Sequence, residues 1–207
     1  MFTVQVKNAS KRFHHEWIFK NLDLELFSGD TLAITGGNGS GKSTLLKCLS
    51  GAIPLTSGAI QYQSGATQIA EEQWFRSLAI ATPYLELPEE FTLSEVLSFH
   101  FQFKNPLQNR STTEILEILG LEKHTSKTIS QFSSGMKQRV KLALAIFSEV
   151  PFLLLDEPTT NLDKQGVTWY LELIQQFTPN RIVVICSNDP IEYDFCDKKI
   201  AVPKKIK

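Results

Sequence analysis

One short stretch decides the fold of this chain: Gly36-Gly37-Asn38-Gly39-Ser40-Gly41-Lys42-Ser43. It follows an apolar run at residues 32–34 and leads into residues 43–49, which have the pattern of a helix. The sequence of 207 residues has 11 glycines, and four of them fall within this stretch. The pattern G-x-x-x-x-G-K-[ST] is satisfied at every fixed position, between an expected strand and an expected helix. The stretch therefore predicts a phosphate-binding loop in an α/β fold.

The spacing of this loop has a physical reason. Its backbone N–H groups must turn toward one polyphosphate, and glycines permit the dihedral angles and the close approach. The helix that follows presents the positive end of its dipole to the anion. We expect Lys42 to reach the β- and γ-phosphates and the Ser43 hydroxyl to bind Mg²⁺. On this interpretation the loop residues that bind the nucleotide are Gly36, Gly37, Asn38, Gly39, Ser40, Gly41, Lys42, Ser43 and Thr44.

Two carboxylates follow a second expected strand. Residues 151–155 form an apolar run, typical of a strand buried on both faces of a parallel sheet, and Asp156 and Glu157 come directly after it. Ligands bind at this carboxyl end of the strands in doubly wound sheets. We therefore expect Asp156 to hold Mg²⁺ through water. Glu157 would orient or deprotonate the water that attacks the γ-phosphate, and the reaction would be hydrolysis.

The rest of the chain predicts an α/β core interrupted by a helical segment. Thr92 and Ser111 each precede a glutamate by three residues, which is the capping-box pattern of a helix start. We expect the core at residues 1–84 and 151–207 and a mostly helical subdomain at about 85–150, in a single domain of residues 1–207. The expected strands lie at residues 2–7, 22–27, 59–62, 78–81 and 181–185, and the expected helices at about 93–103, 112–120 and 163–177.

Composition excludes several classes of protein. Hydrophobic residues make up 42% and charged residues 21%, as in ordinary globular proteins. A net charge of -1 gives no electrostatic reason to expect a nucleic-acid partner. No apolar run reaches the roughly 18 residues of a membrane span, and the first residues lack the pattern of a secretory signal. The three cysteines have no metal-ligand spacing, so we expect reduced thiols.

Four motifs together resemble the ATP-binding cassette (ABC) ATPases, over nearly the whole chain. They are the phosphate loop at 36–43, Ser-Ser-Gly-Met-Lys-Gln-Arg at 133–139, Leu-Leu-Leu-Asp-Glu-Pro at 153–158 and Thr-Asn-Leu-Asp at 160–163, in the family's order. The segment that follows the acidic pair is specific, because other phosphate-loop families lack it. The resemblance implies a phosphate-loop NTPase core with a mostly parallel sheet, an antiparallel N-terminal β subdomain and a helical insertion.

The resemblance also implies partners and further site residues. Two subunits, in a homodimer or a heterodimer with a second ATPase, would hold two ATP molecules head to tail. Ser133 and Gly135 of one subunit would contact the γ-phosphate bound by the other, and Asp163 would lie in the loop that couples the two sites. Phe13 would stack on adenine, although it is also compatible with an ordinary aromatic of a strand. The chain would be cytoplasmic and peripheral at the inner face of the cell membrane, bound to an integral membrane permease.

Three departures from the family pattern bear on activity. The usual Leu-Ser-Gly-Gly-Gln signature is Phe-Ser-Ser-Gly-Met at residues 132–136. Tyr84 stands at about the place of the family's glutamine, and a phenol is a poor ligand for Mg²⁺. Asn188 replaces the switch histidine and cannot carry its positive charge. Loss of such a transition-state contact costs about two to three decades in rate, so we expect slow hydrolysis with Glu157 present.

The function that we predict is Mg-dependent ATP hydrolysis coupled to transport through a separate membrane subunit. The short chain and the form of the motif at 133–139 favour export. Two alternatives stay open: a soluble ABC ATPase outside transport, and a nucleotide-dependent binding module with weakened hydrolysis.

Overall fold

The computed structural model describes residues 1–202 of the chain, which form two units. The first unit contains Met1–Leu78, Pro151–Glu157 and the residues from Asn180 onward. The second unit contains Ala79–Val150 and Pro158–Pro179. The expected helical segment of about 85–150 therefore lies within the second unit, together with residues 79–84 and 158–179. Residues 203–207 of the expected core lie outside the described residues.

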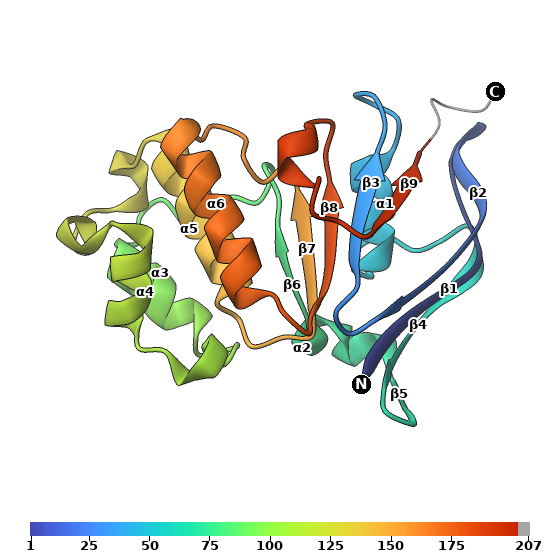
Figure 1. Cartoon of the computed structure of the whole chain (residues 1–207), viewed down its shortest axis with the longest axis horizontal. Helices are drawn as coiled ribbons and strands as arrows, with labels where there is room; N and C mark the ends of the chain where they lie inside the picture. Colours follow the sequence, from blue (N-terminus) through green and yellow to red (C-terminus); the bar gives the residue numbers. More distant parts are fainter. Residues whose placement is uncertain (203–207) are drawn as a thin grey trace. The chain divides into compact units, whose positions relative to one another are not determined.

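The first unit begins with an antiparallel sheet whose strands run in the order β2-β1-β4-β5 (Figure 1). Two of its strands are much longer than the alternation of the sequence predicts. The pairing of β1 with β2 shifts register between Val6 and Ala9, where Asn8 has a φ of 47°. Such irregularities interrupt the period of two on which the prediction rests. The strands are β1 (Phe2–Phe13), β2 (Glu16–Phe27), β4 (Ser57–Ser64) and β5 (Thr67–Ile69).

The first unit also contains parallel strands in the order β7-β8-β3-β9. They are β7 (Phe152–Asp156), β8 (Ile182–Cys186), β3 (Thr31–Thr35) and β9 (Lys198–Ala201). Every residue of β7 and β8 is buried, which explains their apolar composition. Helix α1 (Lys42–Leu49) follows β3 through the phosphate loop, and the division between the units falls within β6 (Leu78–Ala81). The predicted fold class, with a parallel and an antiparallel sheet, is confirmed.

An aromatic cluster joins the two sheets of the first unit. Tyr62 of β4 stacks on Trp74 of α2 (Trp74–Ser77) with ring centroids 4.1 Å apart. Phe152 of β7 packs against the edge of Tyr62 at 5.6 Å and lies 6.5 Å from Phe2. The Tyr62 hydroxyl donates a hydrogen bond to the carbonyl of Leu49 at the end of α1. The antiparallel sheet, the parallel sheet and α1 therefore share one core.

The second unit is mostly helical, and its capping boxes are confirmed. The hydroxyl of Thr92 accepts from the Glu95 N–H at 3.2 Å, while the Glu95 carboxylate accepts from the Thr92 N–H at 2.7 Å. Ser111 and Glu114 form the same pair of bonds at the next helix. Figure 1 shows α5 and α6 side by side in this unit. Its helices are α3 (Leu93–His100), α4 (Thr112–Leu119), α5 (Ser134–Ile146) and α6 (Lys164–Phe177), with short 3-10 turns at Leu107–Asn109, Glu122–His124 and Ile129–Gln131.

Within residues 1–202, every helix is too short or too polar to cross a membrane. The first unit ends with a 3-10 turn at Pro190–Glu192 and the edge strand β9. Lys198 of that strand forms a salt bridge with Asp30, at 2.7 Å. This contact attaches the charged edge strand to the residue that precedes β3.

Replacement of Phe152 by alanine tests the shared core. The Phe152 side chain is fully buried against two aromatic rings, so its removal leaves a cavity. We expect the free energy of unfolding to fall by about 3–5 kcal/mol, measured by urea denaturation. The matched control is Phe75→Ala, because Phe75 lies in the same unit and is 60% exposed. Its effect should stay within about 0.5 kcal/mol; equal losses in the two variants would contradict this description of the core.

Candidate nucleotide-binding site

The phosphate loop lies between β3 and α1, as predicted, and its shape depends on glycine at two positions. Gly36 has a φ of 144° and Gly41 a φ of 112°, in the region that favours glycine. A Cβ atom at Gly36 would come within 2.6 Å of the Val202 carbonyl oxygen, and one at Gly41 would collide with the Ile18 side chain. Larger residues at these two positions would push the loop out of its conformation.

The first turn of α1 is available to an anion. No side chain caps this helix, and the first N–H groups of a helix have no acceptor within the helix itself. Together with the positive end of the helix dipole, they favour a phosphate group. The predicted nucleotide-binding residues Gly37, Asn38 and Gly39 are exposed in the loop, while Ser40 is buried.

Lys42 is the charged residue of the loop, and only 5% of its surface is exposed. Its ammonium donates to the Gly36 carbonyl at 2.8 Å and to Asn188 Oδ1 at 3.1 Å. The Asn188 amide nitrogen in turn donates to Asn38 Oδ1 at 2.7 Å. The structure therefore brings the predicted switch residue into contact with the predicted phosphate-binding lysine.

The predicted metal ligands Ser43 and Asp156 are also brought together. Asp156 ends β7 and is 1% exposed, and burial raises the pKa of its carboxyl group. The nearby Ser43 side chain opposes this rise in pKa, as do the charges of Lys42 and Lys47. Hydroxyl and carboxylate oxygens are ligands that Mg²⁺ prefers, usually with waters and phosphate oxygens completing its shell. These residues therefore fit a magnesium ion bound with a nucleotide.

Glu157 occupies an unusual backbone conformation directly after β7. Its φ is 44°, in the left-handed region that residues other than glycine adopt rarely and at a cost of about 1–3 kcal/mol. Its N–H donates to the Cys186 carbonyl of β8 at 2.8 Å, which anchors this turn of the chain. The charge of Glu157 raises the pKa of Asp156, so the two carboxylates lie close enough to interact.

Phe13 ends β1 and is 42% exposed. The Lys11 ammonium lies 4.7 Å from the centroid of its ring and donates to the Pro54 carbonyl at 2.7 Å. Because Lys11 is buried, this cation holds one side of the ring in place. The exposed part of the ring is available for stacking, and its contact with adenine stays a prediction.

The remaining predicted residues lie in the second unit. Ser133 caps α5, and its hydroxyl accepts from the Met136 N–H at 3.2 Å. A Cβ atom at Gly135 would come within 2.9 Å of the Asn161 carbonyl oxygen, so this position requires glycine or a local shift. Asp163 caps α6 by accepting from the Gly166 N–H at 2.7 Å. The contacts of these three residues with a nucleotide across a dimer stay predictions.

Gln138 is a structural residue that the sequence analysis missed. It is 2% exposed, and its side-chain amide donates to the Pro158 carbonyl at 2.8 Å. This bond ties α5 to the segment between Pro158 and Asp163. A polar residue in a helix is usually exposed, so only its place in the motif at 133–139 could have indicated this role.

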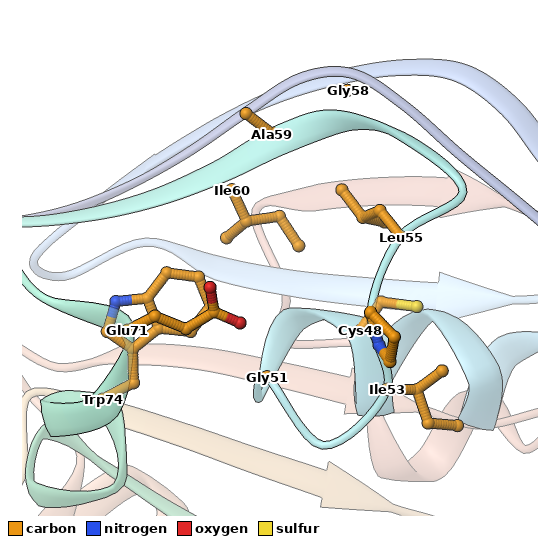
Figure 2. A pocket seen from close by; sticks show the side chains of 10 residues that line it. Cys48, Gly51, Ile53, Leu55, Gly58, Ala59, Ile60, Glu71 and Trp74 are labelled. Carbon is orange, nitrogen blue, oxygen red and sulfur yellow. The ribbon is translucent and has the colours of Figure 1, made fainter.

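A cavity of about 300 Å³ in the first unit is lined by other residues. It is bordered by the end of α1, by β4 and by α2, and Figure 2 shows the side chains that line it. Leu55, Ile60 and Trp74 make much of its wall apolar, and Glu71 is its acidic residue. None of its lining residues belongs to the predicted nucleotide or metal site. The candidate site is therefore the end of the parallel sheet and not this cavity.

Comparisons with known proteins agree with the motifs. A model of the ABC transporter family matches residues 19–160. An uncharacterised ABC transporter ATP-binding protein of Bacillus subtilis, YybJ, is 30% identical over 84% of this chain and 79% of its own length. The cytochrome c biogenesis ATP-binding export protein CcmA of Vibrio cholerae is 31% identical over 80% of each chain.

A solved structure shows the same fold. The dimeric structure of MJ0796, described as a bacterial ABC transporter cassette, has a TM-score of 0.81 at 22% identity, over 97% of this chain and 94% of that one. The family model spans well over half of the sequence and includes the phosphate loop, the motif at 133–139 and the acidic pair. The chain therefore belongs to the ABC transporter family, among its ATP-binding proteins.

Proposed function

We propose that this chain binds Mg-ATP, hydrolyses it and thereby drives transport through a separate membrane permease. The observation that carries the proposal is the meeting of four groups in the first unit. Lys42, Ser43, Asp156 and Asn188 come from three different parts of the chain: the Lys42 ammonium donates to Asn188 Oδ1, and Ser43 and Lys42 lie close enough to Asp156 to lower the pKa of its carboxyl group. Glu157 follows Asp156 directly, at the end of the same strand. This is the set of groups that γ-phosphate hydrolysis requires.

Each residue has a distinct chemical part in this proposal. Lys42 and the first N–H groups of α1 bind and orient the phosphates, and Ser43 and Asp156 hold Mg²⁺. The ion, when bound, neutralises negative charge on the β- and γ-phosphates. Glu157 orients a water molecule and accepts its proton. Asn188 can donate a hydrogen bond but no positive charge, which agrees with slow turnover.

The proposed assembly is a dimer with nucleotide between the subunits. Ser133 stands at the N-terminus of the 13-residue helix α5, where the helix dipole favours a negative charge. In this assembly Ser133 and Gly135 contact the γ-phosphate bound by the other subunit, and Asp163 couples the two sites. The dimeric structure of MJ0796 supports this arrangement only through its common fold.

The proposed permease contact lies on the second unit. Phe91, Phe99 and Phe103 are 37%, 51% and 70% exposed. The centroid of the Phe99 ring lies 6.1 Å from that of Phe91 and 5.2 Å from that of Phe103. Tyr84, which stands at the family's glutamine position, is 61% exposed. A row of exposed aromatic rings is typical of a protein interface. We place the chain at the cytoplasmic face of the membrane, and the name of CcmA as an export protein favours export.

A nucleotide-dependent binding module is the second candidate function. Asn188 favours it, because the neutral amide cannot stabilise developing charge as a histidine cation does. The presence of Glu157 favours hydrolysis instead. A soluble ABC ATPase outside transport has the same site and differs only in its partner.

Replacement of Glu157 by glutamine separates hydrolysis from binding. The amide cannot accept the proton of water, so we expect the turnover number to fall by at least about a hundredfold, while the Kd for ATP changes by less than about twofold. Phosphate release and calorimetric titration measure the two quantities. The matched control is Glu172→Gln in α6, which should change neither. If the native protein binds ATP but releases no more phosphate than Glu157→Gln does, the chain is a binding module.

Replacement of Ser133 by alanine tests the dimer. We expect the Glu157→Gln variant to retain ATP and therefore to dimerise with ATP in analytical ultracentrifugation. Adding Ser133→Ala to this variant should raise the Kd of the dimer about tenfold or more. Ser111→Ala is the matched control, because Ser111 caps a helix through the same kind of bond. Each substitution loses about 1 kcal/mol of capping energy. Equal effects on dimerisation would assign Ser133 to helix capping alone.

Replacement of Phe103 by serine tests the permease contact. We expect affinity purification from detergent-solubilised membranes to recover an integral membrane protein with the native chain and much less of it with Phe103→Ser, because an apolar contact is lost. Phe75→Ser is the control, since Phe75 is an exposed ring of the first unit. Mass spectrometry identifies the partner. Recovery of no integral membrane protein by the native chain would favour the soluble ATPase.

A further inference from the structure

Both polar atoms of the Asn188 side chain are engaged by the phosphate loop. Its oxygen accepts from the Lys42 ammonium at 3.1 Å, and its nitrogen donates to Asn38 Oδ1 at 2.7 Å. A neutral amide can accept on one side and donate on the other in a fixed orientation. Asn188 therefore bridges Asn38 and Lys42 of the loop, at the position where the family has its switch histidine.

The buried ammonium of Lys42 needs such a partner. Lys42 is 5% exposed and forms no salt bridge within the part of the chain that the structure describes. Its acceptors are two neutral oxygens, those of the Gly36 carbonyl and the Asn188 amide. A buried cation without acceptors is costly, so each of these bonds stabilises the folded protein.

The backbone around Asn188 is held firmly. The N–H of Ser187 donates to the Ile34 carbonyl at 3.1 Å, which continues the pairing of β8 with β3. The Asp189 N–H donates to the Ser187 hydroxyl at 2.9 Å, and the Asp189 carboxylate caps the turn that follows. Asn188 is itself exposed, so a ligand can reach its side chain. Its amide is therefore presented to Lys42 from a rigid strand end.

We propose that Asn188 is a positioning residue whose amide oxygen holds a hydrogen bond of Lys42 for which a phosphate oxygen of the nucleotide competes. The inference rests on the proposed function, because it assumes that Lys42 receives nucleotide phosphate. On this proposal, binding exchanges one acceptor for another at one of the three N–H groups of the Lys42 ammonium. Part of the gain from the new bond is offset by the loss of the old one, so Asn188 lowers the affinity for nucleotide.

This role differs from that of a γ-phosphate ligand in a measurable way. A residue that holds the γ-phosphate increases the affinity for ATP and leaves the affinity for ADP unchanged. A residue that competes for Lys42 decreases the affinity for every nucleotide whose β-phosphate reaches the lysine. AMP has no β-phosphate, so its affinity should not depend on Asn188. ADP is therefore the decisive ligand.

The experiment is calorimetric titration of the full chain with Mg-ADP and with AMP, for the native protein, Asn188→Ala and Asn188→Asp. Asn188→Ala removes the competing oxygen and should bind ADP about five- to tenfold more tightly. Asn188→Asp has the same shape and holds Lys42 through a charged pair, so it should bind ADP at least about tenfold more weakly. Thermal unfolding without ligand should occur at a lower temperature in Asn188→Ala and at a higher one in Asn188→Asp.

The opposite signs of the two substitutions make the test decisive. Unchanged or weaker ADP binding by Asn188→Ala would overturn the proposal, and so would an equal change in AMP binding. Circular dichroism shows whether each variant is folded. If Asn188→Ala does not fold, ADP binding by Asn188→Asp still tests the proposal. If the native chain binds neither ATP nor ADP, the proposed function itself fails. If the native chain binds both, but the variants do not change ADP affinity in the expected directions, only the role of Asn188 fails.

Discussion

Three neighbouring parallel strands end at one level of a single sheet, and the candidate site depends on this register. The ladder pairs Ile34 of β3 with Cys186 of β8, and Asp156 of β7 with the same Cys186. Lys42 and Asn188, which are 146 residues apart in the sequence, therefore meet beside the end of β7. A shift of one residue in β7 would move Asp156 by about 3.3 Å along the sheet and separate it from Ser43.

The elements that the sequence predicts well have short-range causes. The capping boxes at Thr92 and Ser111 satisfy backbone groups within three residues, so the pattern alone identifies each helix start. Strands β7 and β8 are buried on both faces and need only apolar side chains, which gives a recognisable run. The phosphate loop is equally local, because the positive φ of Gly36 and of Gly41 favours glycine at both positions.

The parts that the sequence does not predict depend on distant pairing. Strand β1 is 12 residues long, but the irregularity at Asn8 hides its second half from any search for alternation. Strand β9 contains lysines, and its strand conformation depends on parallel pairing with the edge of β3. The bond of Asn188 to Lys42 needs the register of β3 and β8. The sequence could place Asn188 near the phosphates but could not show which atoms its amide meets.

The left-handed backbone of Glu157 costs folding free energy at a position of the candidate site. A glycine or an asparagine would adopt a φ of 44° with less strain, and neither has a carboxylate. The residue that suits the backbone at this turn is therefore not the residue that the proposed hydrolysis requires. A copy of this protein freed from selection for activity would gain stability by losing Glu157. If the proposed function holds, substitution at this strained turn would give a more stable protein that binds its nucleotide without cleaving it.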